Sequence, residues 1–241
     1  MTLAAENSFQ TFGLPHVAVM ALTAVLAVGV AGWARRAGSG RRVRGVCLVL
    51  AGVLVANELL YLAYGLAVAP LEEWARRFLP LHVCGVAIFL TAWTLVKRSQ
   101  YVYEIAYFWG LGGSLQAVLT PNLVVGFPSY WFFQFFITHC VIVVSVLFAT
   151  LAMKMRPAPG AVRRVFVVTN LYLAVVAGVN WLLGSNYMFL RAPPRGASPF
   201  FFLPWPWYIL FLEAAGLGIV WALYLPFAIA RRRGARGHQP G

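Results

Sequence analysis

Long apolar runs with almost no charge recur along this sequence, and they limit its possible folds more than any other feature. A helix that crosses a bilayer needs about 20 mainly apolar residues. Runs of this kind, separated by charged or Pro- and Gly-containing segments, predict seven membrane spans. The predicted spans cover residues 16–34, 45–69, 80–96, 101–119, 131–152, 163–183 and 205–230.

The composition excludes a soluble fold, because 61% of the 241 residues are hydrophobic and only 10% are charged. The sequence therefore predicts an all-α fold, a polytopic helical membrane bundle of about seven transmembrane helices. We expect residues 1–15 to form a short extracytoplasmic leader, residues 16–230 a single transmembrane domain and residues 231–241 a basic cytoplasmic tail. The expected location is a cell membrane, which in a bacterium is the inner membrane.

The basic residues predict the direction in which the chain crosses the membrane. A net charge of +13 would suggest nucleic acid as a partner of a soluble protein, but here the 19 Lys and Arg lie almost entirely in short loops, so no nucleic acid is expected. Arg76, Arg77, Arg191 and Arg195 lie on one side, and the fifteen others should be cytoplasmic. The N-terminus is then outside and the C-terminus inside. The fifteen are Arg35, Arg36, Arg41, Arg42, Arg44, Lys97, Arg98, Lys154, Arg156, Arg163, Arg164, Arg231, Arg232, Arg233 and Arg236.

Ionisable side chains inside the predicted spans are few, and most of them lie in the outer half. Inserting such a group costs roughly 3 kcal/mol, so it is either paired in the bundle or functional. At a rise of ~1.5 Å per residue, Glu58 lies about 16 Å from the outer end of its span, and His139 and Glu213 lie about 12 Å from theirs. His82 begins its span at the outer boundary, close to Cys84. We interpret these groups as one pocket that opens outward or into the outer leaflet.

Catalytic roles are predicted for His82, His139, Glu213 and Cys84. Histidine transfers protons readily near neutral pH, and Glu213 is the predicted anion that orients the imidazole of His139. Cys84 lies two residues after His82, which on a helix is about 200° of rotation, so the two side chains are expected to point apart. The residues predicted to contact substrate are Glu58, Gln116, Asn122, Asn180, Asn186, Tyr187 and Trp207.

Several of these residues also have a structural interpretation. Hydrogen bonds that hold the bundle together explain Glu58 and Glu213 as well as chemistry does. Cys84 and Cys140 fit the role of small packing residues, because free cysteine behaves largely as a buried hydrophobic group. The small residues of the stretch 110–114, Gly-Leu-Gly-Gly-Ser, predict close helix packing. His16, at the start of the first span, is interpreted as interfacial.

Several segments together resemble the bacterial YwaF family of integral membrane proteins, and the resemblance runs from about residue 9 to about residue 225. That family often carries an acid at two positions where this chain has Gly85 and Asn122, so a role for acids there is not expected. The matching segments are Pro-Leu-His-Val-Cys at 80–84, Tyr-Phe-Trp-Gly-Leu at 107–111, Leu-Thr-Pro-Asn-Leu at 119–123, His139 after an aromatic run, Asn180, Gly-Ser-Asn-Tyr-Met-Phe-Leu at 184–190, and Pro-Trp-Pro-Trp-Tyr at 204–208 before Glu213.

The resemblance implies a lipid-modifying activity, because the family is similar in layout to a eukaryotic transmembrane acyltransferase that remodels ether phospholipids. That enzyme is thought to use a cysteine and a histidine in a Pro-Cys-His sequence. The corresponding residues here are Pro80, Leu81 and His82, so the cysteine is absent from that position and Cys84 is the nearest thiol.

Three functions remain open on the sequence alone. The first is a membrane-embedded acyl transferase or hydrolase acting on membrane lipids, with His82 and His139 as general base and acid and Cys84 or a water as nucleophile. The second is a transporter or ligand-binding protein that uses the same pocket. The third is a metal site built from His82, His139 and a Glu, although these residues lack a local metal-binding spacing, and no cofactor is expected. The absence of aspartate excludes a Ser-His-Asp triad, and the scattered cysteines give no disulfide framework.

Overall fold

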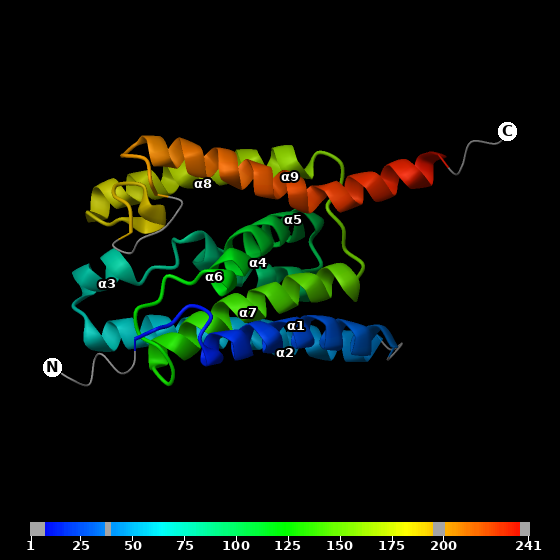
Figure 1. Ribbon diagram of the computed structural model, residues 1–241, viewed down its shortest axis with the longest axis horizontal. Helices are drawn as coiled ribbons and strands as arrows, with labels where there is room; N and C mark the ends of the chain where they lie inside the picture. The colour runs from blue at the N-terminus through cyan, green and yellow to red at the C-terminus, as the bar shows by residue number, and fades with distance from the viewer. Residues whose placement is uncertain (1–7, 37–39, 195–200, 237–241) are drawn as a thin grey trace. The chain divides into compact units, whose positions relative to one another are not determined.

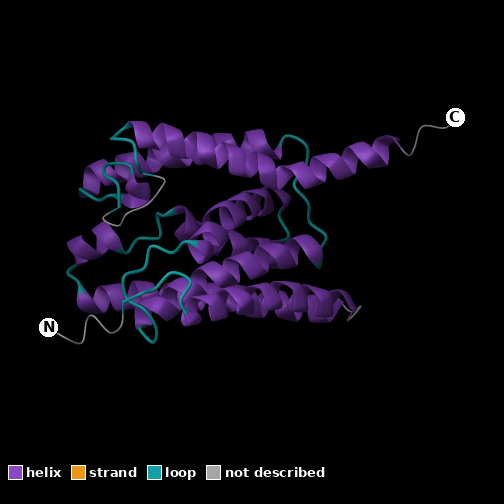
Figure 2. Cartoon of the chain, viewed as in Figure 1, coloured by secondary structure: helices purple, strands orange, loops and turns teal. Residues whose placement is uncertain are grey.

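The computed structural model describes residues 8–36, 40–194 and 201–236. Parts of the predicted leader (1–7) and of the predicted tail (237–241), together with Arg195, lie outside the described residues. Figure 2 shows the described chain as helices joined by loops. The helices are α1 (Leu14–Arg36), α2 (Gly40–Val68), α3 (Leu71–Arg77), α4 (Val83–Lys97), α5 (Gln100–Trp109), the π-helical segment η1 (Gly110–Ser114), α6 (Leu115–Leu119), α7 (Tyr130–Leu151), α8 (Ala161–Leu183), the short 3₁₀ segment η2 (Tyr187–Phe189) and α9 (Trp207–Arg236).

The prediction of an all-α polytopic membrane bundle is confirmed. Within the described residues, α1, α2, α7, α8 and α9 are long and apolar enough to cross a membrane, and α4 is a shorter apolar helix. The fourth predicted span falls on α5, η1 and α6, which follow one another without a break. Every predicted span therefore coincides with helix, while the total of seven spans and their direction stay predictions.

Helix α3 is the element that the apolar runs did not predict. Its sequence Leu-Glu-Glu-Trp-Ala-Arg-Arg carries two ion pairs at i,i+4 spacing, Glu72 with Arg76 and Glu73 with Arg77. Such pairs support a short surface helix without an apolar run. Helix α3 is tied to α2 by Trp74, whose indole donates a hydrogen bond of 3.0 Å to the carbonyl of Leu62 in α2.

The chain folds as two compact units, residues 1–155 and 156–241, and each is described by itself. In the first unit, α2 packs against α4 and α7, α4 packs against α5, and α1 packs against α7 (Figure 1). Small residues allow the close approach of α1, α2 and α4. One buried cluster joins Ala31, Cys47, Ala51, Ala92, Leu95 and Phe148.

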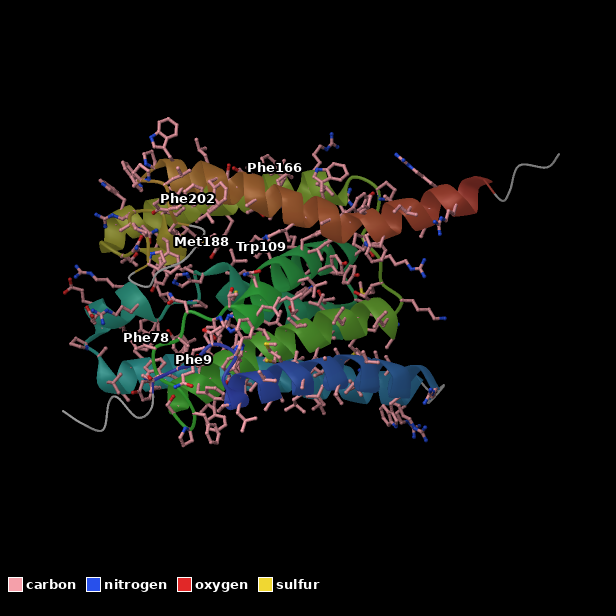
Figure 3. All side chains as sticks on the ribbon, in the orientation of Figure 1. Phe9, Phe78, Trp109, Phe166, Met188 and Phe202 are labelled. Carbon is pink, nitrogen blue, oxygen red and sulfur yellow. The ribbon has the colours of Figure 1, made fainter. Side chains whose placement is uncertain are left out.

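Aromatic side chains fill the end of the first unit where α2 meets α3 and α7. Phe78, which is labelled in Figure 3, lies against Gly65 of α2, where a Cβ atom would come within 2.5 Å of its ring. The Tyr61 ring lies 5.2 Å from that of Phe78 and 6.3 Å from that of Trp131. These aromatic contacts fit the interfacial belt expected at the outer ends of the spans.

The second unit is built on α8 and α9, which lie side by side in Figure 1. Helix α8 begins after Gly160 and ends before Gly184, and both glycines have a positive φ, +78° and +66°. Glycine accepts this left-handed conformation without steric cost, so each end of α8 is set by its sequence.

Candidate functional site

His139 lies in the third turn of α7, and its imidazole is held in one tautomer. Its Nδ1 atom lies 2.7 Å from the backbone carbonyl oxygen of Phe135. A carbonyl oxygen only accepts hydrogen bonds, so Nδ1 carries the proton. The lone pair is then on Nε2, for which the structure gives no hydrogen-bond partner among the described residues. A neutral imidazole oriented in this way is a base with its accepting nitrogen available.

The imidazole of His139 belongs to the α7 face that packs on η1. Phe135, His139, Ile142 and Val146 follow one another at spacings of four, three and four residues, so they share one side of the helix. At Gly110 of η1, a Cβ atom would lie 3.0 Å from Cγ2 of Ile142 and 3.1 Å from Cγ2 of Val146. The predicted close packing of the glycine-rich stretch is therefore confirmed, and it brings η1 against the His139 face.

The segment η1 also contacts the thiol of Cys84. A Cβ atom at Gly113 would lie 3.7 Å from Sγ of Cys84, and the hydroxyl of the next residue, Ser114, neighbours the same thiol. Because η1 leads through α6 and a loop into α7, the two segments run in opposite directions, so one turn from Gly110 toward α6 corresponds to one turn from Ile142 toward the start of α7, which is His139. We therefore expect Cys84, Ser114 and His139 to lie at a similar level around η1. A π-helical insertion of this kind often marks a functional site.

The rotation of about 200° expected between His82 and Cys84 assumes that both residues are helical, and the structure does not support this assumption. His82 precedes the first helical residue of α4 and has an extended backbone, with φ −70° and ψ 150°. Rotation by 100° per residue therefore does not relate the two side chains. Cys84 itself lies in the first turn of α4.

Gly85 completes the local shape of this region. A Cβ atom there would lie 2.9 Å from the backbone Cα, C and O atoms of Pro80. Backbone atoms cannot yield as the end of a flexible side chain can, so a glycine is required for the turn before α4 to pack in this way. The same contact disfavours any side chain at position 85, including that of an acid.

Glu58 of α2 lies at a similar level. Its neighbour Asn57 donates hydrogen bonds to the hydroxyl of Thr138 (2.8 Å) and to the carbonyl of Gln134 (3.2 Å), both on α7. The Glu58 residue is only 3% exposed and makes no hydrogen bond or ion pair with any described residue. Burying a carboxyl without such a partner costs free energy. Glu58 therefore lacks the hydrogen bonds expected of a residue that holds the bundle together.

Three buried hydroxyl groups in the first unit were not predicted as site residues. The side-chain oxygens of Thr91, Ser114 and Ser145 lie within α4, η1 and α7 without a hydrogen-bond partner of regular geometry. Ser and Thr occur throughout the sequence, so their residue type gave no signal. The glycine-rich context of Ser114 was a signal, but it was interpreted only as packing.

Other predicted residues of the first unit have more ordinary surroundings. Gln116 donates a hydrogen bond of 2.7 Å to the hydroxyl of Thr120, and Asn122 is exposed in the following loop. His16 is buried within the protein: its Nδ1 accepts from the backbone N–H of Phe12 (2.9 Å), so its Nε2–H donates to the carbonyl of Val118 (2.7 Å). Both ring nitrogens of His16 are used, which gives it a structural role.

In the second unit, Asn180 organises the turn that follows α8. Its amide nitrogen donates to the carbonyl of Tyr187 (2.9 Å), and its amide oxygen accepts from the Ser185 hydroxyl (2.8 Å) and the Tyr187 backbone N–H (2.7 Å). Asn186 similarly donates to the carbonyl of Ala192 and accepts from two backbone N–H groups. The motif at residues 184–190 is therefore a tightly bonded turn, and substrate contact by Asn180, Asn186 and Tyr187 stays a prediction.

The Pro-Trp-Pro-Trp-Tyr motif is tied to the same turn. The Trp205 indole donates to the carbonyl of Leu190 (3.0 Å), and the Tyr208 hydroxyl donates to the carbonyl of Phe189. Trp207 is exposed at the start of α9, and Glu213 is half-buried two turns further on. Because Glu213 and His139 belong to different units, their pairing stays a prediction; the carbonyl of Phe135 already bonds Nδ1 of His139.

Metal binding has no side-chain cluster to support it within the part of the chain that the structure describes. No group of three or more His, Cys, Asp or Glu side chains that could hold a metal ion occurs there. Zinc and iron sites need three or four such ligands around one point. The arrangement around η1 offers instead an imidazole, a thiol and a hydroxyl, which are the groups used in nucleophilic chemistry.

Comparisons with known proteins identify a family of membrane proteins. The model of the TMEM164 family matches residues 11–224, which include Cys84, Ser114, His139 and Asn180. An uncharacterized protein from Treponema pallidum (strain Nichols) is 30% identical over 160 residues, or 65% of this chain and 64% of that protein. The chain thus spans less than two thirds of that relative's length. No solved structure matches the chain. The resemblance to the YwaF family stays a prediction.

Proposed function

We propose, from the premise that the chain belongs to the TMEM164 family, that it is a membrane-embedded acyl transferase or hydrolase whose substrates are membrane lipids. One observation carries the proposal: the hydrogen bond from Nδ1–H of His139 to the carbonyl of Phe135 leaves the Nε2 lone pair to act as a base inside the bundle. The layout shared with a lipid-remodelling acyltransferase supports the choice of substrate.

In the proposed reaction, Nε2 of His139 removes a proton from the nucleophile, which is the Cys84 thiol or a water. On the thiol route, sulfur attacks the ester carbonyl of a phospholipid, a thioester forms, and the bond to the glycerol oxygen breaks. The imidazolium returns its proton to that oxygen, which leaves a lysophospholipid. An acceptor hydroxyl or a water then loses its proton to His139 and attacks the thioester, and Cys84 regains its proton.

The remaining groups have supporting roles in this proposal. Ser114 beside Cys84 supplies a hydroxyl that can donate to the sulfur when it is negatively charged. His82, at the start of α4, is the second proton-transfer group. Helix α4, with 15 residues, is shorter than α7, with 22, and this is compatible with a thiol at the start of α4 lying level with a residue in the middle of α7.

The test combines lipid analysis in cells with a purified assay. Lipid composition is compared between cells that contain the wild-type protein, the His139→Ala variant or no protein. In parallel, the purified protein in nanodiscs receives a phospholipid with a labelled acyl chain. We expect release or transfer of the label by the wild type and loss of this activity in His139→Ala. An unchanged lipid composition together with no turnover in nanodiscs would rule out the proposal.

The identity of the nucleophile needs a separate experiment. On the water route, Cys84→Ala lowers activity only mildly and no acyl group is found on the protein. On the thiol route, Cys84→Ala removes activity, and mass spectrometry finds the acyl group on the peptide that contains Cys84. Cys140→Ala is the matched control, since Cys140 is also half-buried but is not among the residues placed against η1.

The second candidate function is a carrier or ligand-binding protein, and Glu58 is the observation that favours it. A buried carboxyl without a hydrogen-bond partner among the described residues is a typical proton-coupling group in a membrane protein. The discriminating variant is Glu58→Gln, which keeps the shape of the side chain and removes its charge. A carrier would lose proton-coupled uptake into proteoliposomes, whereas the enzyme would retain labelled-lipid turnover.

A further inference from the structure

A cavity of about 350 Å³ lies between α8 and α9 in the second unit, at the end where both helices carry arginines. Phe166 of α8, labelled in Figure 3, and Leu217, Trp221 and Tyr224 of α9 line it with apolar and aromatic surface. Arg163 contributes the charged part of the lining. The volume lies within the range of small-molecule sites, about 300–1,000 Å³.

The positive charge at this end has no acidic counterpart in its own unit. Residues 156–241 contain seven arginines near this end that the structure describes and only one acid, Glu213. Glu213 lies 18 residues from Arg231 along α9, a distance of about 27 Å at the rise of a helix. These arginines are therefore expected to attract an anion from outside the unit.

Arg231 is held in place with part of its guanidinium unused. Its Nη1 donates to the carbonyl of Pro157 (2.8 Å), and its Cζ lies 5.0 Å from the centre of the Tyr224 ring. Its Nη2 is buried and has no hydrogen-bond partner among the described residues. Tyr224 lines the cavity and also lies under the guanidinium of Arg231, so Arg231 neighbours the lining of the cavity.

The start of α8 adds further donors. Gly160 begins the helix without a side-chain cap, and it lines the cavity together with Val162 and Arg163. The N–H groups of the first turn point out of the helix end and carry a partial positive charge, which suits a phosphate group. Arg163 and the start of α8 thus border the apolar groove, and Arg231 neighbours its lining residue Tyr224.

We propose that this cavity binds an anionic phospholipid, with its phosphate between Arg163, Arg231 and the first turn of α8 and one acyl chain along Phe166, Trp221 and Leu217. From Tyr224 to Leu217 the groove follows two turns of α9, about 10 Å, which fits part of one acyl chain. The predicted topology places this end in the cytoplasm, where anionic headgroups meet clustered arginines. The site is built from residues of the second unit alone and does not depend on the proposed reaction.

The test uses the full-length protein in phosphatidylcholine nanodiscs that contain increasing amounts of phosphatidylglycerol with brominated acyl chains. Bromine quenches nearby tryptophan fluorescence, and the difference between the wild type and Trp221→Phe isolates the signal of Trp221. We expect saturable quenching by brominated phosphatidylglycerol and weaker, non-saturable quenching by brominated phosphatidylcholine. Equal quenching by the two lipids would overturn the proposal.

Two double variants with the same loss of charge separate a built site from diffuse surface charge. Arg163→Gln with Arg231→Gln should weaken phosphatidylglycerol binding by roughly tenfold, because charge-assisted hydrogen bonds are lost. Arg232→Gln with Arg233→Gln, at two exposed positions of the same helix, should leave it within about twofold. An equal loss in both double variants would contradict a site at the cavity.

Two further measurements check that the result is not caused by misfolding and that the ligand is not phosphate alone. Arg163→Gln alone removes a side chain that makes no hydrogen bond with a described residue, so it should weaken binding without disturbing the fold. Inorganic phosphate added in excess should not displace the lipid, because it lacks the acyl chain. Retained binding in Arg163→Gln, or displacement by phosphate alone, would refute the proposed lipid site.

Discussion

Two polar regions of this protein, the turn after α8 and the interior around η1, differ in how their hydrogen-bonding groups are used. At the turn, the amide of Asn180 makes three hydrogen bonds and that of Asn186 makes three. Around η1, Nε2 of His139 and the hydroxyl of Ser114 lack such partners. Saturated groups stabilise a conformation, whereas unsaturated buried groups cost free energy and are kept where chemistry needs them.

The difference also leads us to expect that the most distinctive sequence motifs are not the reactive site. The motifs at 184–190 and 204–208 are specific, and the structure uses their polar groups to join η2 to the start of α9. By contrast, the glycine-rich stretch at 110–114 has a common composition, yet it contacts both the Cys84 thiol and the His139 face of α7. Variants in the two regions should therefore differ in whether they lose stability or activity.

The largest effect is expected for His139→Ala. Removing the proposed general base should lower lipid turnover by about a thousandfold, because general base catalysis typically contributes factors of 10² to 10⁴. Turnover of a labelled phospholipid is measured on protein that elutes as a single species after purification. Cys140→Ala, at the next position of α7, should retain activity. Full activity in His139→Ala would show that the reaction does not take place beside η1.

Asn180→Ala should have the largest effect on stability. It removes three hydrogen bonds from a fully buried residue, so we expect a loss of about 3 kcal/mol in the free energy of unfolding. Thermal unfolding in detergent measures the change, and activity per folded molecule should be retained. Asn170→Ala, also on α8, removes one exposed bond to the carbonyl of Phe166 and should cost less than about 1 kcal/mol. Lost activity with normal stability would instead support substrate contact by Asn180.

Much of the fold could be predicted from the sequence, because hydropathy reports directly on lipid exposure. Each predicted span coincides with helix, since a long apolar run leaves a chain in lipid with few alternatives to helix. Helix α3 was missed because its stability comes from ion pairs such as Glu72 with Arg76 rather than from an apolar run. The extended backbone at His82 was missed because the helix was assumed to begin at the edge of the apolar run.

The site was only partly predictable, because hydrogen-bond satisfaction depends on contacts between distant residues. Depth along a span singled out His139 as a candidate, but the tautomer of its imidazole depends on the carbonyl of Phe135 in the folded helix. Depth along a span did not distinguish Glu58, which lacks a hydrogen-bond partner among the described residues, from Asn180, whose amide is fully bonded. That separation needed the structure.

Gly85→Ala should have an intermediate effect. The added methyl would meet backbone atoms of Pro80 at 2.9 Å, and overpacking of this kind costs about 2 kcal/mol. Because the turn before α4 must shift, we also expect reduced lipid turnover through displacement of Cys84. Gly52→Ala, in α2, places a methyl where nothing lies within 4 Å and should leave both stability and activity unchanged. Equal behaviour of the two variants would show that the contact with Pro80 is not needed.

Ser114→Ala should have the smallest effect on stability and is the sharpest test of the distinction between the two regions. Its hydroxyl is buried without a regular hydrogen-bond partner, so its removal should change the free energy of unfolding by less than about 0.5 kcal/mol, or stabilise the protein slightly. Lipid turnover should nevertheless fall by about tenfold, because a hydrogen bond to the negatively charged sulfur of Cys84 is lost.

Ser145→Ala is the matched control, since Ser145 has an equally buried, unpartnered hydroxyl on α7 but lies nearly two turns from His139. It should leave both the free energy of unfolding and the turnover rate unchanged. If the two serine variants behave alike, Ser114 is a packing residue and a missing hydrogen bond does not identify the reactive groups of this bundle. If only Ser114→Ala loses activity at unchanged stability, the hydroxyl serves the reaction, because a structural group would have changed the stability first.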